Sequence, residues 1–233
     1  MNCLYTYWSK EGENVDCGFG FPQFFFECAG KSIRTAFKNY ESVIIYTDSI
    51  GKSILETNIP EVKDCKIVTI DYSEYDFDSR YWNFPKMITY SLQEEPFIHI
   101  DFDVFLKDDF SKQTNTVYDI YSETIREYGY VKKHLDKFSK DGKMPNKIIC
   151  SGIIGGNNIE VFKKNFEIAK EVCKPTKKKV HFEDLWAIEE YSFTKLAVDM
   201  GLHALEFEQD SYLHFQGKYK YSKYNEEIKK FEI

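Results

Sequence analysis

The sequence predicts an α/β fold in which a mostly parallel central sheet is flanked by helices. Short β-rich runs alternate with amphipathic helical segments throughout the 233 residues. An apolar run at 97–100 leads into two acidic residues, as strands of open α/β sheets do at their ligand-binding ends. No linker rich in Pro, Gly or Ser divides the chain, so we expect a single domain over residues 1–233.

The expected strands are runs rich in β-branched and aromatic residues. They cover residues 2–8, 42–47, 65–70, 97–101, 147–154 and 203–207. Between the first two, apolar residues recur at helical spacing from Phe24 to Tyr40, which indicates a helix that packs on the core.

Three further helices are expected. The first covers residues 81–93, and the second begins at Asn158, a suitable N-cap. The third covers residues 182–200 and ends at Gly201, because glycine readily adopts the left-handed conformation found after helices.

Composition and charge narrow the classes of function. The 38 acidic and 31 basic residues give a net charge of −7, which argues against nonspecific nucleic-acid binding. Six cysteines without a C-x-x-C pair are expected to be free thiols. Since the N-terminus lacks a signal-peptide pattern and no apolar run is long enough to span a membrane, we expect a cytoplasmic protein, with peripheral attachment to a membrane left open.

The pair Asp101 and Asp103 carries the strongest functional signal. In an extended strand, residues two apart point to the same side, so both carboxylates could face one divalent cation. Carboxylates are the hard oxygen ligands that Mg²⁺ and Mn²⁺ prefer, and such a cation commonly binds phosphate oxygens. The alternative is a strand end with two solvated aspartates.

Other polar residues also lie at expected strand ends or near the acids. Thr6, Tyr7 and Trp8 could offer a stacking ring and hydroxyls to a base and ribose, and Asp48 closes the next strand. Lys86, on the helix before the acidic pair, could approach phosphates or the acids. The alternatives are ordinary turn or cap residues and a surface lysine.

The turn at Gly156 and Asn157 joins a strand to a helix. Its glycine would let backbone approach a ligand closely, which suits a corner that binds sugar hydroxyls. A plain strand-to-helix turn explains it equally well.

Glu183 and Asp184 stand at the start of the helix expected over 182–200. Acids in a first turn stabilise a helix through its dipole, so half of this signal has a purely structural explanation.

The segment from His214 to Lys220 could complete a metal site. A histidine can bind the metal directly, and Lys218 or Lys220 could place an ammonium charge on a departing phosphate.

Together, these motifs resemble those of the metal-dependent glycosyltransferases of the GT-A fold. That family carries Asp-x-Asp at the end of a central strand, where this chain has Asp101 and Asp103, and several members carry a C-terminal His-x-x-Gly-x-x-Lys, matched by His214, Gly217 and Lys220. The resemblance implies a single Rossmann-like nucleotide-diphospho-sugar transferase domain. Residues 1–110 would form its nucleotide-binding half, and residues 111–233 would form the donor-sugar and acceptor half with the C-terminal metal and phosphate segment.

The resemblance also implies the reaction: a hexosyl group moves from a nucleotide-sugar, expected to be a UDP-sugar, to a hydroxyl of a glycan, lipid-linked or small-molecule acceptor. Mn²⁺ or Mg²⁺ would be held by Asp103 and His214, with Asp101 binding through the metal or the ribose. Lys220, or Lys218 in its place, would stabilise the leaving group. An inverting reaction would need Glu183 or Asp184 as base, whereas a retaining reaction would need none.

Two alternatives stay open. A haloacid-dehalogenase-like Mg²⁺-dependent phosphatase also places Asp-x-Asp after an apolar strand, but on its first strand, whereas about a hundred residues precede Asp101 here. A noncatalytic binding protein with a GT-A-like fold is the second.

Overall fold

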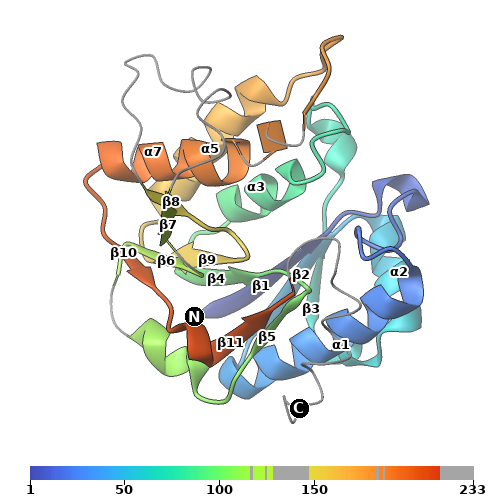
Figure 1. Ribbon diagram of the computed structural model, residues 1–233. Coiled ribbons are helices and arrows are strands. Elements are labelled where there is room, and N and C mark those ends of the chain that lie inside the picture. Colours follow the sequence, from blue (N-terminus) through green and yellow to red (C-terminus); the bar gives the residue numbers. More distant parts are fainter. Residues whose placement is uncertain (116–117, 124, 128–146, 182–183, 186, 216–233) are drawn as a thin grey trace. The chain divides into compact units, whose positions relative to one another are not determined.

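The computed structural model describes residues 1–115, 118–123, 125–127, 147–181, 184–185 and 187–215. It has a mixed α/β architecture with a main sheet of seven mostly parallel strands, which confirms the predicted fold class (Figure 1). The chain forms two compact units. The first contains residues 1–71, 98–115 and 208–215, and the second contains residues 72–97 and the described part of 118–207. The single domain expected over 1–233 stays a prediction.

Four strands of the main sheet, in the order β4-β1-β2-β3, belong to the first unit, apart from Phe97 at the start of β4. Their bounds are β1 (Asn2–Tyr7), β2 (Val43–Thr47), β3 (Lys66–Thr69) and β4 (Phe97–Ile100). β2 pairs in parallel with both neighbours, since Ile45 lies opposite Tyr5 of β1 and opposite Ile67 of β3. All residues of β2 and β4 are buried, as is usual for strands covered on both faces.

Helix α1 (Pro22–Asn39) is the predicted helix between the first two strands. It begins with a proline, whose fixed φ suits the first turn of a helix. Its apolar stripe is buried and therefore belongs to the core, as predicted; it includes Phe24, Phe25, Cys28, Ala29, Ile33 and Ala36. The short helix α2 (Ser49–Asn58) is not predicted from the sequence, because it buries only Gly51 and Leu55.

A small antiparallel sheet of β5 (Val104–Leu106) and β11 (Tyr212–His214) completes the first unit. α1 packs against it: Ser32 Oγ donates to the carbonyl of Val104 at 2.6 Å, and Leu106 N donates to Thr35 Oγ1 at 3.0 Å. Neither strand is predicted as such, because three-residue strands carry too little periodicity to recognise.

The second unit contains the remaining strands of the main sheet, in the order β10-β6-β9. Ala204 of β10 lies opposite Ile120 of β6 in a parallel pair, and Tyr121 of β6 lies opposite Gly155 of β9 in an antiparallel one. The bounds of these strands are β6 (Ile120–Ser122), β9 (Ile153–Gly156) and β10 (Ala204–Glu206). A separate antiparallel pair contains β7 (Ile125–Glu127) and β8 (Lys147–Ile149).

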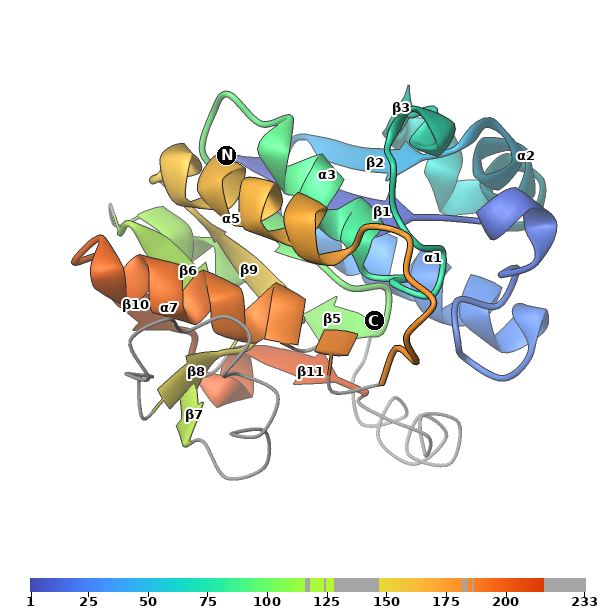
Figure 2. The ribbon, with the colours of Figure 1, turned by 90° about the horizontal axis from the view of Figure 1, so that it is seen from above.

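Three helices of the second unit lie side by side: α3 (Phe84–Ser91), α5 (Ile159–Val172) and α7 (Ser192–Asp199) (Figure 2). The ring of Phe162 on α5 joins them, with its centroid 5.8 Å from that of Tyr90 and 4.9 Å from that of Phe193. This aromatic cluster forms the core of the unit.

Two predicted element boundaries are wrong in the second unit. The strand expected over 147–154 is two strands, because β8 pairs with β7 and β9 pairs with β6, and the chain bends at Ser151 and Gly152 between them. The helix expected over 81–93 is shorter, since α3 begins at Phe84 with Pro85 in its first turn.

The predicted start of α5 and the predicted end of α7 are confirmed. Asn158 caps α5 by accepting a hydrogen bond from Val161 N at 3.3 Å, and Gly201, with a φ of +67°, follows α7 in the left-handed conformation. The helix expected over 182–200 is interrupted by a π-helical segment, Ala187–Tyr191, which the sequence does not reveal.

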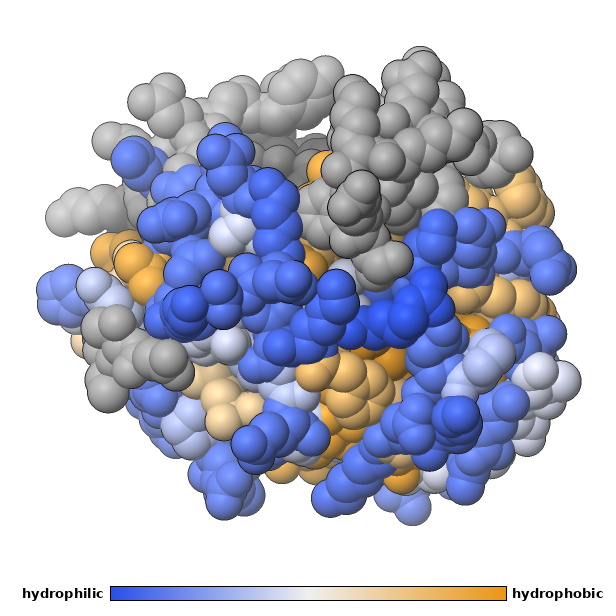
Figure 3. All heavy atoms as spheres, turned by 90° about the horizontal axis from the view of Figure 1, so that it is seen from below, coloured by the Kyte–Doolittle hydropathy of each residue, from blue (hydrophilic) through white to orange (hydrophobic). Residues whose placement is uncertain are grey.

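On the face drawn in Figure 3, the described residues are largely hydrophilic, with apolar areas between them. Among the described helices, none has the length and apolar character needed to cross a membrane. All six cysteines are free thiols, as predicted.

Candidate metal centre

Asp101 and Asp103 lie on a tight turn between β4 and β5, and not on a strand as expected. β4 ends at Ile100, and Val104 N donates to the carbonyl of Asp101 at 3.0 Å, which closes the turn. The residue between them, Phe102, is buried: its ring stacks on that of Tyr5 with centroids 4.8 Å apart. The buried ring anchors the turn, so the fold, and not strand alternation, fixes the two carboxylates.

His214 reaches this turn through the pairing of β11 with β5. It lies opposite Val104 in the antiparallel register, and Phe215 N donates to the carbonyl of Asp103 at 3.0 Å. The pairing therefore brings residues from distant parts of the sequence to the same place.

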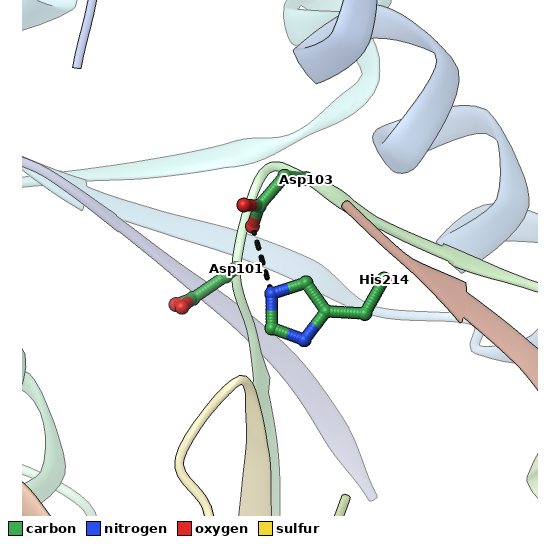
Figure 4. A group of neighbouring side chains, drawn as sticks. All are labelled: Asp101, Asp103 and His214. Atoms are coloured by element: carbon green, nitrogen blue, oxygen red, sulfur yellow. Dashed lines mark ion pairs between the residues drawn. The ribbon is translucent and has the colours of Figure 1, made fainter. Parts of the chain in front are cut away.

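Asp101, Asp103 and His214 form an Asp–Asp–His cluster (Figure 4). One potential ligand atom from each residue lies within 4.8 Å of the others, and Asp103 Oδ1 is 3.4 Å from His214 Nε2. The side chains of Asp103 and His214 are 7% and 9% exposed, whereas that of Asp101 is 23% exposed, so the cluster is largely buried but open at Asp101.

The chemistry of this cluster fits a divalent cation. Two carboxylates supply hard oxygen ligands and balance two positive charges, while an imidazole nitrogen suits Mn²⁺ as well as other transition metals. Three protein ligands would leave coordination positions for oxygen atoms of a substrate, as is usual for cations that act on phosphates.

His99, on β4, lies beside this cluster and is missed by the sequence analysis. Its side chain is 1% exposed, its Nε2 forms a 3.0 Å hydrogen bond with Thr6 Oγ1, and its Nδ1 lies 3.9 Å from Asp101 Oδ1. A histidine within an apolar run, two positions before the first acid, is the signal that could have indicated it.

The polar residues after β1 and β2 have local partners. Tyr7 is fully buried and donates its hydroxyl to the carbonyl of Asn14 at 3.1 Å; burial raises the pKa of this hydroxyl well above its usual value. Asp48 caps α2 by accepting from Gly51 N at 2.6 Å, and it also accepts from Ser9 Oγ at 2.7 Å. The Tyr7 ring is therefore part of the core, and its role in binding a base or ribose stays a prediction.

Trp8 and Thr6 remain accessible in part. Both are half-buried, and the carbonyl of Trp8 accepts from Asn14 Nδ2 at 3.1 Å. Thr6, one of the three residues expected to offer groups to a base and ribose, is linked to the Asp–Asp–His cluster through His99.

In the second unit, Lys86 pairs with Glu189, with Nζ 3.0 Å from Oε1 and side chains 13% and 5% exposed. The same carboxylate accepts from Asn83 Nδ2 at 3.2 Å. Lys86 is therefore not a plain surface lysine.

The remaining predicted residues of the second unit stabilise turns and a helix start. Gly156 has a φ of +151°, and a Cβ there would lie 2.1 Å from the carbonyl oxygen of Asp119, so only glycine fits. Asn157 Nδ2 donates to the carbonyl of Tyr118 at 2.7 Å, and Asp184 Oδ2 accepts from His181 N at 2.9 Å.

Three of the expected catalytic and phosphate-binding residues, Glu183, Lys218 and Lys220, lie outside the described residues, as does Gly217.

Comparison with solved structures agrees with the fold. The chain superposes on 4-diphosphocytidyl-2C-methyl-D-erythritol synthase from Anaerococcus prevotii with a TM-score of 0.51 and 11% identity, covering 98% of this chain and 95% of that one. It also matches a galactosyltransferase, LgtC, solved with donor and acceptor sugar analogues (TM-score 0.47, 9% identity, 82% and 71% covered). A third match is mouse xyloside xylosyltransferase 1 (0.44, 9%, 89% and 84%).

The first of these matches and the strand arrangement define the class as an α/β fold of the nucleotide-diphospho-sugar transferase, or GT-A, type. Within this class, the chain belongs to a family of unknown function (DUF6734), whose model matches residues 1–201. No curated protein matches the sequence.

Proposed function

We propose that this protein is a metal-dependent glycosyltransferase, which moves a hexosyl group from a nucleotide-sugar to an acceptor hydroxyl. The observation that carries the proposal is the convergence of Asp101, Asp103 and His214 on one point of a GT-A-type fold. We expect Mn²⁺ or Mg²⁺ as the metal and a UDP-sugar as the donor. The acceptor would be a glycan, a lipid-linked sugar or a small molecule.

In this proposal, the Asp–Asp–His cluster holds the cation, which supplies Lewis-acid stabilisation of the leaving diphosphate. Asp103 and His214, the more buried pair, would bind it directly, and Asp101 would bind the donor through the metal or the ribose. Because the two carboxylates already balance a divalent charge, the diphosphate needs further positive charge. Lys220, or Lys218, provides it as the phosphate departs.

The remaining predicted site residues have roles in binding the donor or in supporting the residues that do. Thr6 and Trp8 contact the base and ribose, while Tyr7 and Asp48 support this edge of the first unit through their hydrogen bonds to Asn14 and Ser9. In the second unit, Gly156 and Asn157 would contact hydroxyls of the donor sugar, and Lys86 would place positive charge near the phosphates.

The stereochemistry determines the role of two further acids. If the reaction inverts the anomeric centre, Glu183 or Asp184 removes the proton of the acceptor hydroxyl; if it retains configuration, neither is needed for that step.

Calorimetric titration with UDP, GDP and CDP tests the proposal, each in Mn²⁺ and in EDTA. We expect one diphosphate to bind in Mn²⁺ and at least tenfold more weakly in EDTA. Asp103→Asn removes a ligand charge at constant size and should abolish this metal dependence. The matched control is Asp108→Asn, which alters an acid, 78% exposed in its side chain, that pairs with Lys38.

The outcomes separate the alternatives. Diphosphate binding followed by sugar release from the matching nucleotide-sugar supports a transferase. Diphosphate binding without any turnover indicates a noncatalytic binding protein, and hydrolysis of phosphate monoesters without diphosphate binding indicates a phosphatase. Absence of Mn²⁺-dependent binding to all three nucleotides would overturn the proposal.

A further inference from the structure

His99 offers a contact to the proposed metal site that the predicted motifs do not include. It projects from the middle of β4, a strand whose four residues are all buried, and it is itself fully buried. A buried imidazole is costly unless its nitrogens have polar partners. Its two nitrogens face two groups of the first unit: Thr6 on β1 and Asp101 on the turn.

The contacts select one tautomer of the imidazole. With the carboxylate of Asp101 3.9 Å from Nδ1, a hydrogen on Nδ1 is attracted to it, whereas a lone pair there would be repelled. The hydrogen then cannot be on Nε2 of a neutral ring, so Nε2 accepts the 3.0 Å hydrogen bond from the Thr6 hydroxyl. Thr6 therefore orients the ring, and the ring presents its N–H to Asp101.

Asp101 is the member of the cluster that most needs such a contact. Its side chain is 23% exposed, against 7% for Asp103 and 9% for His214, so packing restricts it least. Groups that contact metal-binding carboxylates hold them in the orientation that the metal requires, and removing such groups typically weakens metal binding 10- to 100-fold.

We propose that His99 is a positioning residue, which holds the Asp101 carboxylate toward the metal through its Nδ1 hydrogen and is itself oriented by the hydroxyl of Thr6. The inference rests on the proposed metal site. It assigns a role to a histidine whose place in the chain, inside an apolar strand, otherwise indicates a core residue.

Mn²⁺ binding, measured by the loss of the free-ion electron paramagnetic resonance signal, tests this inference without any substrate. We expect His99→Leu to weaken Mn²⁺ binding by about tenfold or more. His99→Asn places an amide N–H near the position of Nδ1 and should recover much of the affinity, whereas His99→Gln, whose amide extends toward the position of Nε2, should not. His203→Asn is the control, because its imidazole lies 3.7 Å from Asp119 but is 87% exposed.

Thr6→Val gives a second test that does not depend on whether the His99 variants fold. Valine keeps the shape of threonine and suits a strand, but it lacks the hydroxyl that orients the ring. We expect Mn²⁺ binding to weaken in Thr6→Val and to stay near the wild-type value in Thr6→Ser, with thermal unfolding measured for each variant.

The results distinguish the two proposals. If the wild type binds Mn²⁺ and both His99→Leu and Thr6→Val bind it within twofold of the wild type, the role of His99 is wrong while the metal site stands. If the wild type binds no Mn²⁺, the metal site itself is wrong, and the role of His99 with it.

Discussion

Two groups of buried or half-buried carboxylates differ in the partners that the fold gives them. In the first unit, Asp103 and Asp101 face histidines, at 3.4 Å from His214 and 3.9 Å from His99. In the second unit, Glu189 faces the ammonium group of Lys86 at 3.0 Å. A neutral histidine can bind a metal beside an acid, whereas a lysine neutralises the acid itself. Burial alone therefore does not distinguish an acidic cluster that suits a metal from a carboxylate that an ammonium group already neutralises; the neighbouring side chain does.

Removal of the lysine should have the largest effect on stability. Lys86→Met leaves the buried carboxylate of Glu189 without its cation, and we expect a loss of about 3 to 5 kcal/mol in the free energy of unfolding. Urea denaturation measures it, with Lys163→Met as control, because Lys163 pairs with Glu94 at an exposed position. Adding Glu189→Leu to Lys86→Met should restore much of the stability. If Lys86→Met is no less stable than its control, the pair does not compensate a buried charge.

The matching change in the first unit should affect metal binding more than stability. His214→Gln removes the imidazole, and we expect Mn²⁺ affinity to fall on the order of a hundredfold, about 2.7 kcal/mol. Calorimetry measures the affinity, and His203→Gln, at an exposed histidine of the second unit, is the control. A fall in unfolding free energy with unchanged Mn²⁺ affinity would contradict the assignment of His214 as a ligand.

The buried ring between the two acids should show how the turn is held. Phe102→Leu loses the contacts with the rings of Tyr5 and Phe25, and we expect a destabilisation of about 1 to 2 kcal/mol. Mn²⁺ affinity should fall as well, since the turn that carries both ligands is anchored less firmly. Phe21→Leu, at a ring that is 43% exposed, should change neither quantity. Unchanged affinity in a destabilised Phe102→Leu would show that the turn does not need this anchor.

The smallest effect concerns an ion pair of the second unit, between the exposed Arg80 and the half-buried Asp78. Hydrogen bonds from Arg80 hold the pKa of Asp78 well below its usual range. The pair therefore stabilises the fold when Asp78 is ionised, above the aspartate pKa of about 4 in unfolded chains, and this stabilisation is lost as the pH falls toward the folded value. Asp78→Asn should cost less than about 1 kcal/mol at pH 7. Unfolding measured from pH 7 to pH 3 should show that the difference in free energy of unfolding between the wild type and Asp78→Asn becomes smaller. A difference that stays constant would contradict a role for the ionised Asp78.

The strands, helix faces and helix ends that depend on a local pattern of residues are predicted from the sequence. The runs that become β1 to β4, the apolar stripe of α1, the Asn158 cap and the left-handed Gly201 are all confirmed. It also indicates the three members of the Asp–Asp–His cluster, because an acidic pair after a buried strand and a later histidine are visible as residue types.

The sequence does not predict features that depend on contacts between residues far apart in the chain. The turn that replaces the expected strand at Asp101 places the Phe102 ring against that of Tyr5, and the strand that carries His214 pairs with β5. His99 is hidden because a histidine inside an apolar run resembles a core residue until Thr6 and Asp101 are placed beside it.

The pairing of β5 with β11 has a consequence for how the protein is made. Val104 and His214 lie opposite each other in this pair, so the Asp–Asp–His cluster closes a loop that spans almost half of the chain. Such a contact forms late, because the chain must first lose the entropy of closing a long loop. A ribosome-bound chain whose synthesis has not reached residue 214 has only two of the three proposed ligands. Metal loading would therefore report that β11 has reached its place, and it would stabilise the protein only from that moment.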